Sequence, residues 1–490
     1  MIKIGICSVR LVGRSMDELG GFVRIPSPRD SKKKSWERHP CVFFLVSVSV
    51  LMGLVEEIGT PHPMVTFIVI GCGNRGLGYS RYAPENPERA RLIAVVDPIP
   101  ERRELVVRAS GFGKKVEEYK DWHDLPMDPI ADVAIIATQD NAHVEPAVAL
   151  LGKGYHILLE KPMATNRSDC LAIVEAWKKA RLKDPTRILA VCHIMRYTAY
   201  SREINRIIHS GAIGDLMNIQ HLEPVGHFHF AHSYVRGKWS NQGKCGSCVL
   251  LAKSCHDIDW LIYQVGGSPV VKLSSFGSLT HFTKKNKPVN ATSRCLDCPL
   301  ADSGCPYSAK IIYLDRVKSG HTRWPVNVLT PGIPDIESVE QALRTGPYGR
   351  CVYDCDNDQP DKQMVMLEFK NGVTASFTMV AFTKEICVRK TRVFGTLGEL
   401  ECDGKNIKVT TFLPDFTTTI TPRGLTKEDT LLDGHDGADW YLMNAFMAAV
   451  GTHNPDLIMT GPEESLESHL CVFAAEDARI TNSVVNPIYY

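Results

Sequence analysis

The stretch that most constrains the fold is residues 65–76, which read VTFIVIGCGNRG. Residues 65–70 form an apolar, β-branched run that is typical of a buried parallel strand. Gly71, Gly73 and Gly76 follow in G-x-G-x-x-G spacing. The first glycine permits a tight turn, the second lets the backbone approach a pyrophosphate, and the third lets the next helix pack closely on the strand. The stretch therefore predicts a strand–turn–helix unit that binds a dinucleotide.

A second apolar run, residues 91–96, ends in Asp97. In dinucleotide sites, an acidic residue about twenty positions beyond the glycine loop binds the adenosine ribose. Its charge favours NAD over NADP, whose ribose carries a phosphate. We therefore expect NAD, with NADP as the alternative because Arg102 and Arg103 lie close by. Two residues inside the glycine loop are assigned to the same site, Asn74 and Arg75.

After Asp97, strand and helix signals alternate, as in a doubly wound parallel sheet. Residues 99–110 and 141–151 have helical composition, and residues 131–137 and 155–159 read as core strands. Ligands of such sheets bind at the carboxyl ends of the strands. The predicted cofactor site therefore also includes Thr138, His143, Glu160 and Lys161.

Six short motifs carry a resemblance to a known family: GCGNRG at 71–76, ATQDNAH at 137–143, LLEKPMA at 158–164, MRY at 195–197, SGAIGD at 210–215 and CHDIDWL at 255–261. From about residue 65 onward, the chain resembles the Gfo/Idh/MocA family of NAD(P)-dependent sugar and inositol oxidoreductases. The resemblance implies an α/β fold with a Rossmann doubly wound parallel sheet, followed by an α+β domain with a large open antiparallel sheet. It also implies a homo-oligomer assembled through that second sheet.

The expected domain organisation follows from these motifs. Residues 64–189 would form the dinucleotide-binding domain, and residues 190–490 the substrate and oligomerisation domain. Residues 1–63 are expected to be a poorly ordered extension, since residues 26–40 are polar and basic.

Two residues are candidates for catalysis, Lys161 and His256. A lysine beside the nicotinamide can hydrogen-bond a hydroxyl and stabilise alkoxide charge. An imidazole with a pKa of about 6.5 can take the hydroxyl proton. The resemblance assigns these roles, whereas the residues alone also fit a surface lysine and a buried core histidine. His256 and Asp259 lie three positions apart, so on a helix they share one face.

One position departs from the family pattern. Family members commonly carry an aspartate four residues before the histidine, where this chain has Ala252 followed by Lys253. Lys253 would then either supply a second cation to the site or be exposed.

The segment GHFHFAHSYVRGKW at 226–239 combines hydrogen-bond donors with aromatic rings, as expected of a sugar or polyol site. The predicted substrate-binding residues are Arg196, His232, Tyr234, Arg236, Trp239, Lys253 and Asp259. Alternatively, the three histidines of this segment, His227, His229 and His232, are metal ligands.

Three cysteines, Cys295, Cys298 and Cys305, form a C-x2-C-x6-C pattern. Clustered thiols of this kind are typical of a structural zinc site, which normally needs four ligands. Cys351 and Cys355 are candidates for the fourth, and free thiols are the alternative.

Composition limits the possible partners. With a net charge of +1 and 23% charged residues, the chain is not expected to bind nucleic acid or an anionic membrane. Its 16 cysteines, spread over 490 residues, suit a reducing compartment, so we expect a cytoplasmic protein. The apolar run 41–54 is too short to span a bilayer comfortably, and leaves a membrane or secretory segment as the minor alternative.

Together these features predict hydride transfer between a sugar, polyol or related cyclic alcohol and NAD(P). A glycosidase that uses NAD transiently is a second hypothesis, because segments 434–439 and 465–481 are similar to that branch of the superfamily. A non-catalytic nucleotide-binding regulator is a third, against which the intact Lys161 and His256 argue.

Overall fold

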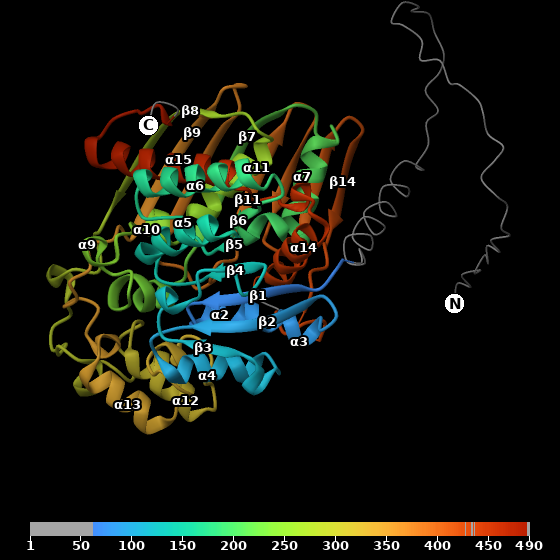
Figure 1. Ribbon diagram of the computed structural model, residues 1–490. Helices are drawn as coiled ribbons and strands as arrows, with labels where there is room; N and C mark the ends of the chain where they lie inside the picture. The colour runs from blue at the N-terminus through green and yellow to red at the C-terminus, as the bar shows by residue number, and fades with distance from the viewer. Residues whose placement is uncertain (1–61, 427, 433–434, 436, 488–490) are drawn as a thin grey trace, which may run out of the picture. The chain divides into compact units, whose positions relative to one another are not determined.

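The first sheet in the chain has six parallel strands in the order β3-β2-β1-β4-β5-β6, which confirms the predicted Rossmann fold. The computed structural model describes residues 62–426, 428–432, 435 and 437–487 (Figure 1). The strands are β1 (Val65–Ile70), β2 (Ala90–Val96), β3 (Glu117–Tyr119), β4 (Val133–Ile136), β5 (His156–Leu159) and β6 (Leu189–Val191).

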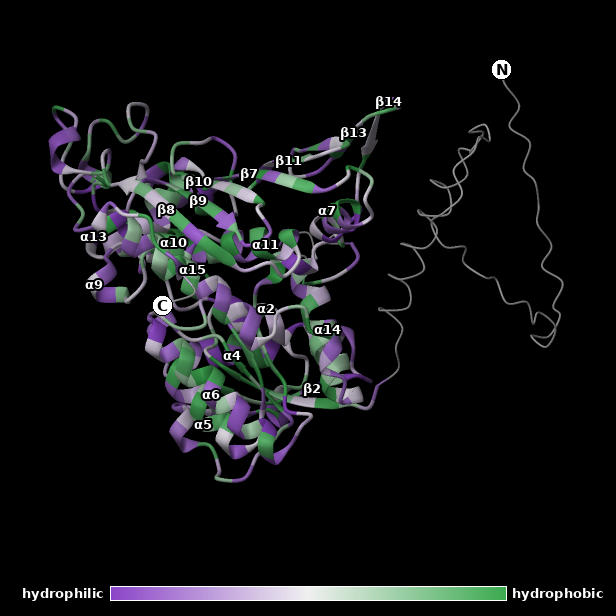
Figure 2. Ribbon diagram, turned by 90° about the horizontal axis from the view of Figure 1, so that it is seen from above, coloured by the Kyte–Doolittle hydropathy of each residue, from purple (hydrophilic) through white to green (hydrophobic). Residues whose placement is uncertain are grey.

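The central strands are apolar throughout because both of their faces are covered. In β1, Ile68 and Ile70 belong to the core shared with α5 and α6, while Phe67 and Val69 are equally buried on the opposite face. Figure 2 shows these strands mostly green, with purple on the surrounding helices. The main helices of this part are α2 (Asn74–Ser80), α4 (Pro100–Ala109), α5 (Val144–Lys153) and α6 (Arg167–Lys183), with the short α3 (Tyr82–Glu85).

The second sheet has eight strands in the order β14-β13-β12-β11-β7-β10-β9-β8. All neighbouring pairs are antiparallel except β7 with β10, so the predicted open antiparallel sheet is confirmed. Its strands are β7 (Leu216–Pro224), β8 (Val270–Ser278), β9 (Lys362–Phe369), β10 (Thr374–Val380), β11 (Lys390–Gly395), β12 (Gly398–Cys402), β13 (Ile407–Phe412) and β14 (Asp415–Ile420).

Helices cover only one face of this sheet over β8 and β9. There, α15 (Pro462–Thr481) packs on β8, while α11 (Cys255–Val265) packs on the neighbouring β7 and β10 (Figure 1). β9 accordingly alternates exposed and buried residues. On the opposite face, Phe276, Met364 and Met366 are 63%, 48% and 55% exposed. Phe276 pairs directly with Met364 across β8 and β9, so the three form one apolar patch.

A long irregular segment, residues 279–361, connects β8 to β9. Its longest helix is α13 (Ile336–Thr345), and it has a small core of its own that includes Cys295. The remaining helices of the described chain are α7 (Ala199–His209), α8 (His227–Phe230), α9 (Gln242–Cys245), α10 (Val249–Ala252), α12 (Asp315–Lys318) and α14 (Ala438–Thr452).

Both sheets lie in one compact unit, residues 57–490. The first sheet continues through Val191, so the domain boundary predicted after residue 189 falls inside β6. The predicted extension and its apolar run 41–54 lie outside the described residues, apart from residues 62 and 63. Over the described ranges, every helix is too short or too polar to cross a membrane.

The packing of α2 on β1 generates the first prediction. A Cβ on Gly76 would lie 2.1 Å from the Gly71 carbonyl oxygen, whereas a Cβ on Gly78 in the same helix meets no atom within 4 Å. We expect Gly76→Ala to lower the free energy of unfolding by about 1–3 kcal/mol because the backbone must move. Gly78→Ala should be neutral or stabilising by up to about 1 kcal/mol. Urea unfolding of both variants tests this, and equal stabilities would contradict it.

Candidate active site

The glycine loop has the shape that a dinucleotide requires. Gly71 has a φ of +92°, and a Cβ there would lie 2.5 Å from the Ala137 carbonyl oxygen. Gly73, by contrast, has no neighbouring atom within 4 Å of its Cβ position. The backbone is therefore fixed at Gly71 and open at Gly73, where a pyrophosphate would approach. This arrangement fits the predicted cofactor.

Asp97 ties the end of β2 to this loop. Its carboxylate accepts hydrogen bonds from the backbone N–H of Cys72 and of Ile99, both at 2.9 Å. Each carboxylate oxygen keeps a further lone pair for a ribose hydroxyl. The Arg103 side chain donates to the Asp97 carbonyl oxygen at 2.6 Å and pairs with Glu118 at 3.1 Å. The Arg103 guanidinium is therefore already bound to protein groups beside the loop.

The segments after β4 and β5 are fastened together by His143. Its Nδ1 donates to the Pro162 carbonyl oxygen at 2.8 Å, and burial lowers its pKa. Its Nε2 is buried and has no hydrogen-bond partner in the described structure, so it can accept one from a ligand. Thr138 donates to the Ala142 carbonyl oxygen at 3.0 Å, which shapes the loop after β4.

Glu160 is the centre of a buried charge network. Its carboxylate accepts from Arg75 Nε at 2.5 Å and from the Tyr79 hydroxyl at 2.6 Å. Arg75 also binds Asp439 of α14 through two nitrogens, at 2.7 and 2.9 Å. Burial alone would raise the pKa of Glu160, but Arg75 and Lys161 outweigh it and lower the pKa. Arg75 and Glu160 therefore act as structural ties, and their part in cofactor binding stays a prediction.

Lys161 extends from the end of β5 toward α10. Its Nζ donates to the Ala252 carbonyl oxygen at 2.8 Å. Ala252 stands four residues before His256, where the aspartate of the resembling proteins would be. At this position a neutral carbonyl therefore takes the place of a carboxylate beside Lys161.

His256 is buried near the start of α11. Burial, reinforced by the charge of Lys161, lowers its pKa well below the ordinary value. The ring is therefore neutral at neutral pH and can accept a proton. Its Nδ1 is buried and has no hydrogen-bond partner in the described structure.

His193 meets this ring edge-on, with ring centroids 5.6 Å apart. Both nitrogens of His193 are also buried and lack a partner within the described residues. The sequence analysis missed His193, although it directly precedes the motif at 194–197 after β6.

Two predicted substrate contacts, Arg196 and Asp259, bind each other instead. The pair is bidentate, with both distances 2.7 Å, and both side chains are buried. Arg196 also donates to the Met459 carbonyl oxygen at 2.9 Å. Because their charges are already paired, the structure does not support direct substrate contacts from these two residues.

Lys253 is not exposed: its side chain is 12% accessible and its Nζ lies 3.0 Å from Glu223. The same nitrogen lies 3.0 Å from the Cys387 sulfur. Burial would lower the pKa of Lys253, but the Cys387 and Glu223 side chains raise it. Arg389 completes the network by pairing with Glu223 and with Asp257, each at 2.8 Å. Lys253 is therefore a fixed cation, and no local motif indicates its acidic partner, Glu223.

Residues 226–239 divide between two places. The Trp239 indole N–H donates to the Asp140 carboxylate at 2.9 Å. The ring centroids of Tyr234 and Trp239 are 6.1 Å apart. His232 instead accepts from or donates to the Tyr313 hydroxyl at 2.8 Å, and Arg236 lines a cavity among the cysteines. The prediction that His232 and Arg236 contact substrate is therefore not supported, because both side chains are held by residues 279–361.

The alternative of a histidine metal site also lacks support. His227 lies 3.1 Å from the Thr383 carbonyl oxygen, His229 lies 3.6 Å from the Cys387 sulfur, and His232 faces Tyr313. Over the described residues, no three histidine, cysteine, aspartate or glutamate side chains are already arranged around a metal position.

Comparisons with known proteins agree with this geometry. Residues 65–183 match the family described as oxidoreductase family, NAD-binding Rossmann fold. Inositol 2-dehydrogenase of Salmonella paratyphi B is 28% identical over 146 residues, which are 30% of this chain and 42% of that protein. The chain thus aligns with less than half of this curated relative.

Solved structures show the same fold over a longer range. An oxidoreductase from Agrobacterium radiobacter in complex with NAD+, L-tartaric acid and magnesium is 17% identical, with a TM-score of 0.61, covering 86% of this chain and 98% of that one. Levoglucosan dehydrogenase in complex with NADH and L-sorbose is 19% identical, with the same TM-score and coverage. Residues 65–183 of this chain therefore match the Gfo/Idh/MocA oxidoreductase family over its NAD-binding Rossmann fold.

Proposed function

We propose that this protein is an NAD-dependent oxidoreductase that oxidises a secondary hydroxyl of a sugar, polyol or related cyclic alcohol. The observation that carries the proposal is that Lys161 donates to the Ala252 carbonyl oxygen, four residues before His256, whose pKa is lowered by burial and by the Lys161 charge. Lys161 contacts the backbone just before α11, and its charge acts directly on the histidine. The pair lies where the strand ends and the glycine loop of a Rossmann fold receive the cofactor.

The chemistry divides between these two groups. NAD, when bound, supplies the hydride acceptor. The Lys161 ammonium has three donors, of which one is used by the Ala252 carbonyl oxygen. Its remaining donors bind the reacting oxygen and stabilise the negative charge that develops there. His256, as the neutral base, accepts the hydroxyl proton.

Other residues near this pair suit a hydroxyl-rich ligand. Tyr234 and Trp239 offer aromatic faces, and Lys253 is a buried cation whose charge is balanced by Glu223. The named relatives, inositol 2-dehydrogenase and levoglucosan dehydrogenase, support a cyclic polyol as substrate. A screen for NADH formation against sugars, polyols and aryl glycosides identifies the substrate, and release of the aglycone would instead favour the NAD-dependent glycosidase.

The cofactor preference can be measured without a substrate. Asp97 beside the adenosine ribose should repel a 2′-phosphate, while Arg103 is engaged with Glu118. We expect NADH to bind on the order of tenfold or more tightly than NADPH, a difference of about 1.4 kcal/mol. Fluorescence titration of both cofactors measures this ratio. Tighter binding of NADPH would contradict the assignment of Asp97.

Catalysis should depend on both members of the pair. Lys161→Met and His256→Ala are each expected to reduce kcat by about 10²–10⁴-fold, the usual contribution of acid–base help. NADH affinity should change little in either variant. The matched controls are Lys244→Met and His123→Ala, whose side chains are 72% and 64% exposed.

The dependence of kcat on pH below neutrality gives a second test of the roles of Lys161 and His256. The lowered pKa of His256 should keep the enzyme active below the ordinary histidine value of about 6.5. If Lys161→Met and His256→Ala retain the rates of their controls, the catalytic pair is misassigned.

We further propose that the protein forms a homo-oligomer through the exposed face of the second sheet. The apolar patch of Phe276, Met364 and Met366 supports this, since soluble monomers rarely expose such a surface. Met366→Lys should shift the protein toward monomer in light scattering. Met127→Lys adds the same charge at a methionine that is 81% exposed and lies outside the second sheet, and is the matched control. An unchanged mass for Met366→Lys would place the interface elsewhere.

A further inference from the structure

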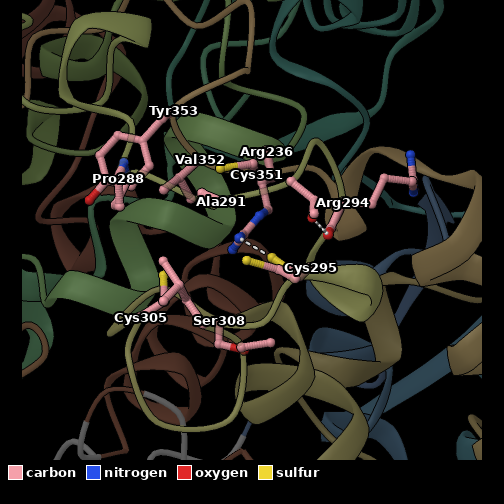
Figure 3. Close-up of a pocket in the computed structure, with 14 residues that line it drawn as sticks. Arg236, Pro288, Ala291, Arg294, Cys295, Cys305, Ser308, Cys351, Val352 and Tyr353 are labelled. Atoms are coloured by element: carbon pink, nitrogen blue, oxygen red, sulfur yellow. Dashed lines mark hydrogen bonds between the residues drawn. The ribbon is translucent and has the colours of Figure 1, made fainter.

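Four cysteines line one small cavity in the irregular part of the chain. They are Cys295, Cys298 and Cys305, together with Cys351 from more than forty residues further along the sequence. The cavity holds about 20 Å³, which is close to the volume of one water molecule. Figure 3 shows Arg236 pointing into it, with Cys295, Cys305 and Cys351 around the guanidinium.

The backbone brings these cysteines together. Arg294 and Arg350 form an antiparallel bridge, so Cys351 lies opposite Ser293, and Cys295 is its diagonal neighbour across the bridge. The Cys351 N–H also donates to the Ser293 carbonyl oxygen at 2.8 Å. Cys298 closes a tight turn by donating its N–H to the Cys295 carbonyl oxygen at 3.2 Å. The convergence therefore depends on main-chain pairing and not on the positions of flexible side chains.

Arg236 indicates the charge that the cavity should hold. Its side chain is buried and donates to the Arg350 and Tyr307 carbonyl oxygens, at 2.7 and 2.8 Å, and to the Cys295 sulfur at 3.2 Å. Its Nη1 is buried without a hydrogen-bond partner, and within the described structure no carboxylate pairs with it. A buried cation without a counter-ion is costly. Thiolates in the cavity would supply the missing negative charge.

We propose that Cys295, Cys298, Cys305 and Cys351 bind one structural zinc ion. Four thiolates around Zn²⁺ carry a net charge of −2, which the adjacent Arg236 partly offsets. Binding releases the four thiol protons, because zinc is ligated by the thiolate form. The cavity volume suits a single ion and not an iron–sulfur cluster.

The thiols must move to reach zinc, since Zn–S bonds are about 2.3 Å long. Over the described residues no three of these groups already surround a common position. Cys298 and Cys305 are partly exposed at the cavity, so their side chains have space to turn toward it.

A bound metal would also stabilise residues 279–361, which have little regular secondary structure. Irregular segments of this length are uncommon inside compact domains, and the small core of this one includes Cys295 itself. A bound metal is a usual substitute for a large core in such segments. The same segment reaches the active site: Asn327 donates to the Asn74 side chain at 2.8 Å, and the Trp324 ring lies 4.9 Å from His229. Zinc would therefore hold the segment that touches the glycine loop.

The test measures metal content of the full chain, purified without chelators. Mass spectrometry of the metals should find near one zinc per chain, and cobalt substitution should give thiolate-to-metal charge-transfer bands of a tetrahedral site. Cys351→Ser should lose most of the zinc. Cys355→Ser is the matched control, because the Cys355 thiol donates to the Cys351 carbonyl oxygen at 3.2 Å and does not line the cavity.

If Cys351→Ser does not fold, the wild-type chain is titrated with a mercurial reagent instead. Release of zinc in step with the modification of four thiols supports the site. Wild-type protein without zinc would overturn the proposal. Iron with inorganic sulfide would also overturn it. So would equal zinc loss from Cys351→Ser and Cys355→Ser.

Discussion

The candidate active site depends on one partly buried arginine in the glycine loop. Arg75 binds Glu160 at the end of β5 and Asp439 of α14, so a single guanidinium joins three distant parts of the chain. Burying these charges is costly unless they are paired and hydrogen-bonded. Burial would raise the pKa of Asp439, but Arg75 keeps it lowered. Because Glu160 is held in this way, the adjacent Lys161 emerges from a fixed point of the backbone.

A second network of paired charges holds the residues around Lys253 in place. Lys253 and Arg389 share Glu223, and Arg389 also binds Asp257 of α11. Between the two networks lies His256, whose pKa is lowered by burial and by Lys161. In the proposed mechanism, Lys161 is the cation that meets the reacting oxygen, next to a base that stays neutral. This division of charge is what hydroxyl oxidation requires.

Local motifs predicted the glycine loop, Lys161 and His256, because each depends on a few neighbouring residues. Asp439 was not predictable as a partner of Arg75, because 364 positions separate the two residues. Glu223 was not predictable as a partner of Lys253, because it lies on a different element, β7. Arg236 was assigned to substrate because its neighbours in sequence are aromatic and polar, yet its contacts come from residues 307–350. The strand β14 is also hard to predict, because it is exposed along most of its length and so lacks an apolar alternation.

The most direct test of the central claim is a crystal structure of the protein with NADH. The account predicts the pyrophosphate against Gly73 and the nicotinamide beside Lys161 and His256. The reactive ring carbon should then face a space from which both side chains reach a substrate oxygen at about 3 Å. A nicotinamide directed away from Lys161 and His256, with the pyrophosphate still at the glycine loop, would contradict the assignment of this pair as the catalytic centre.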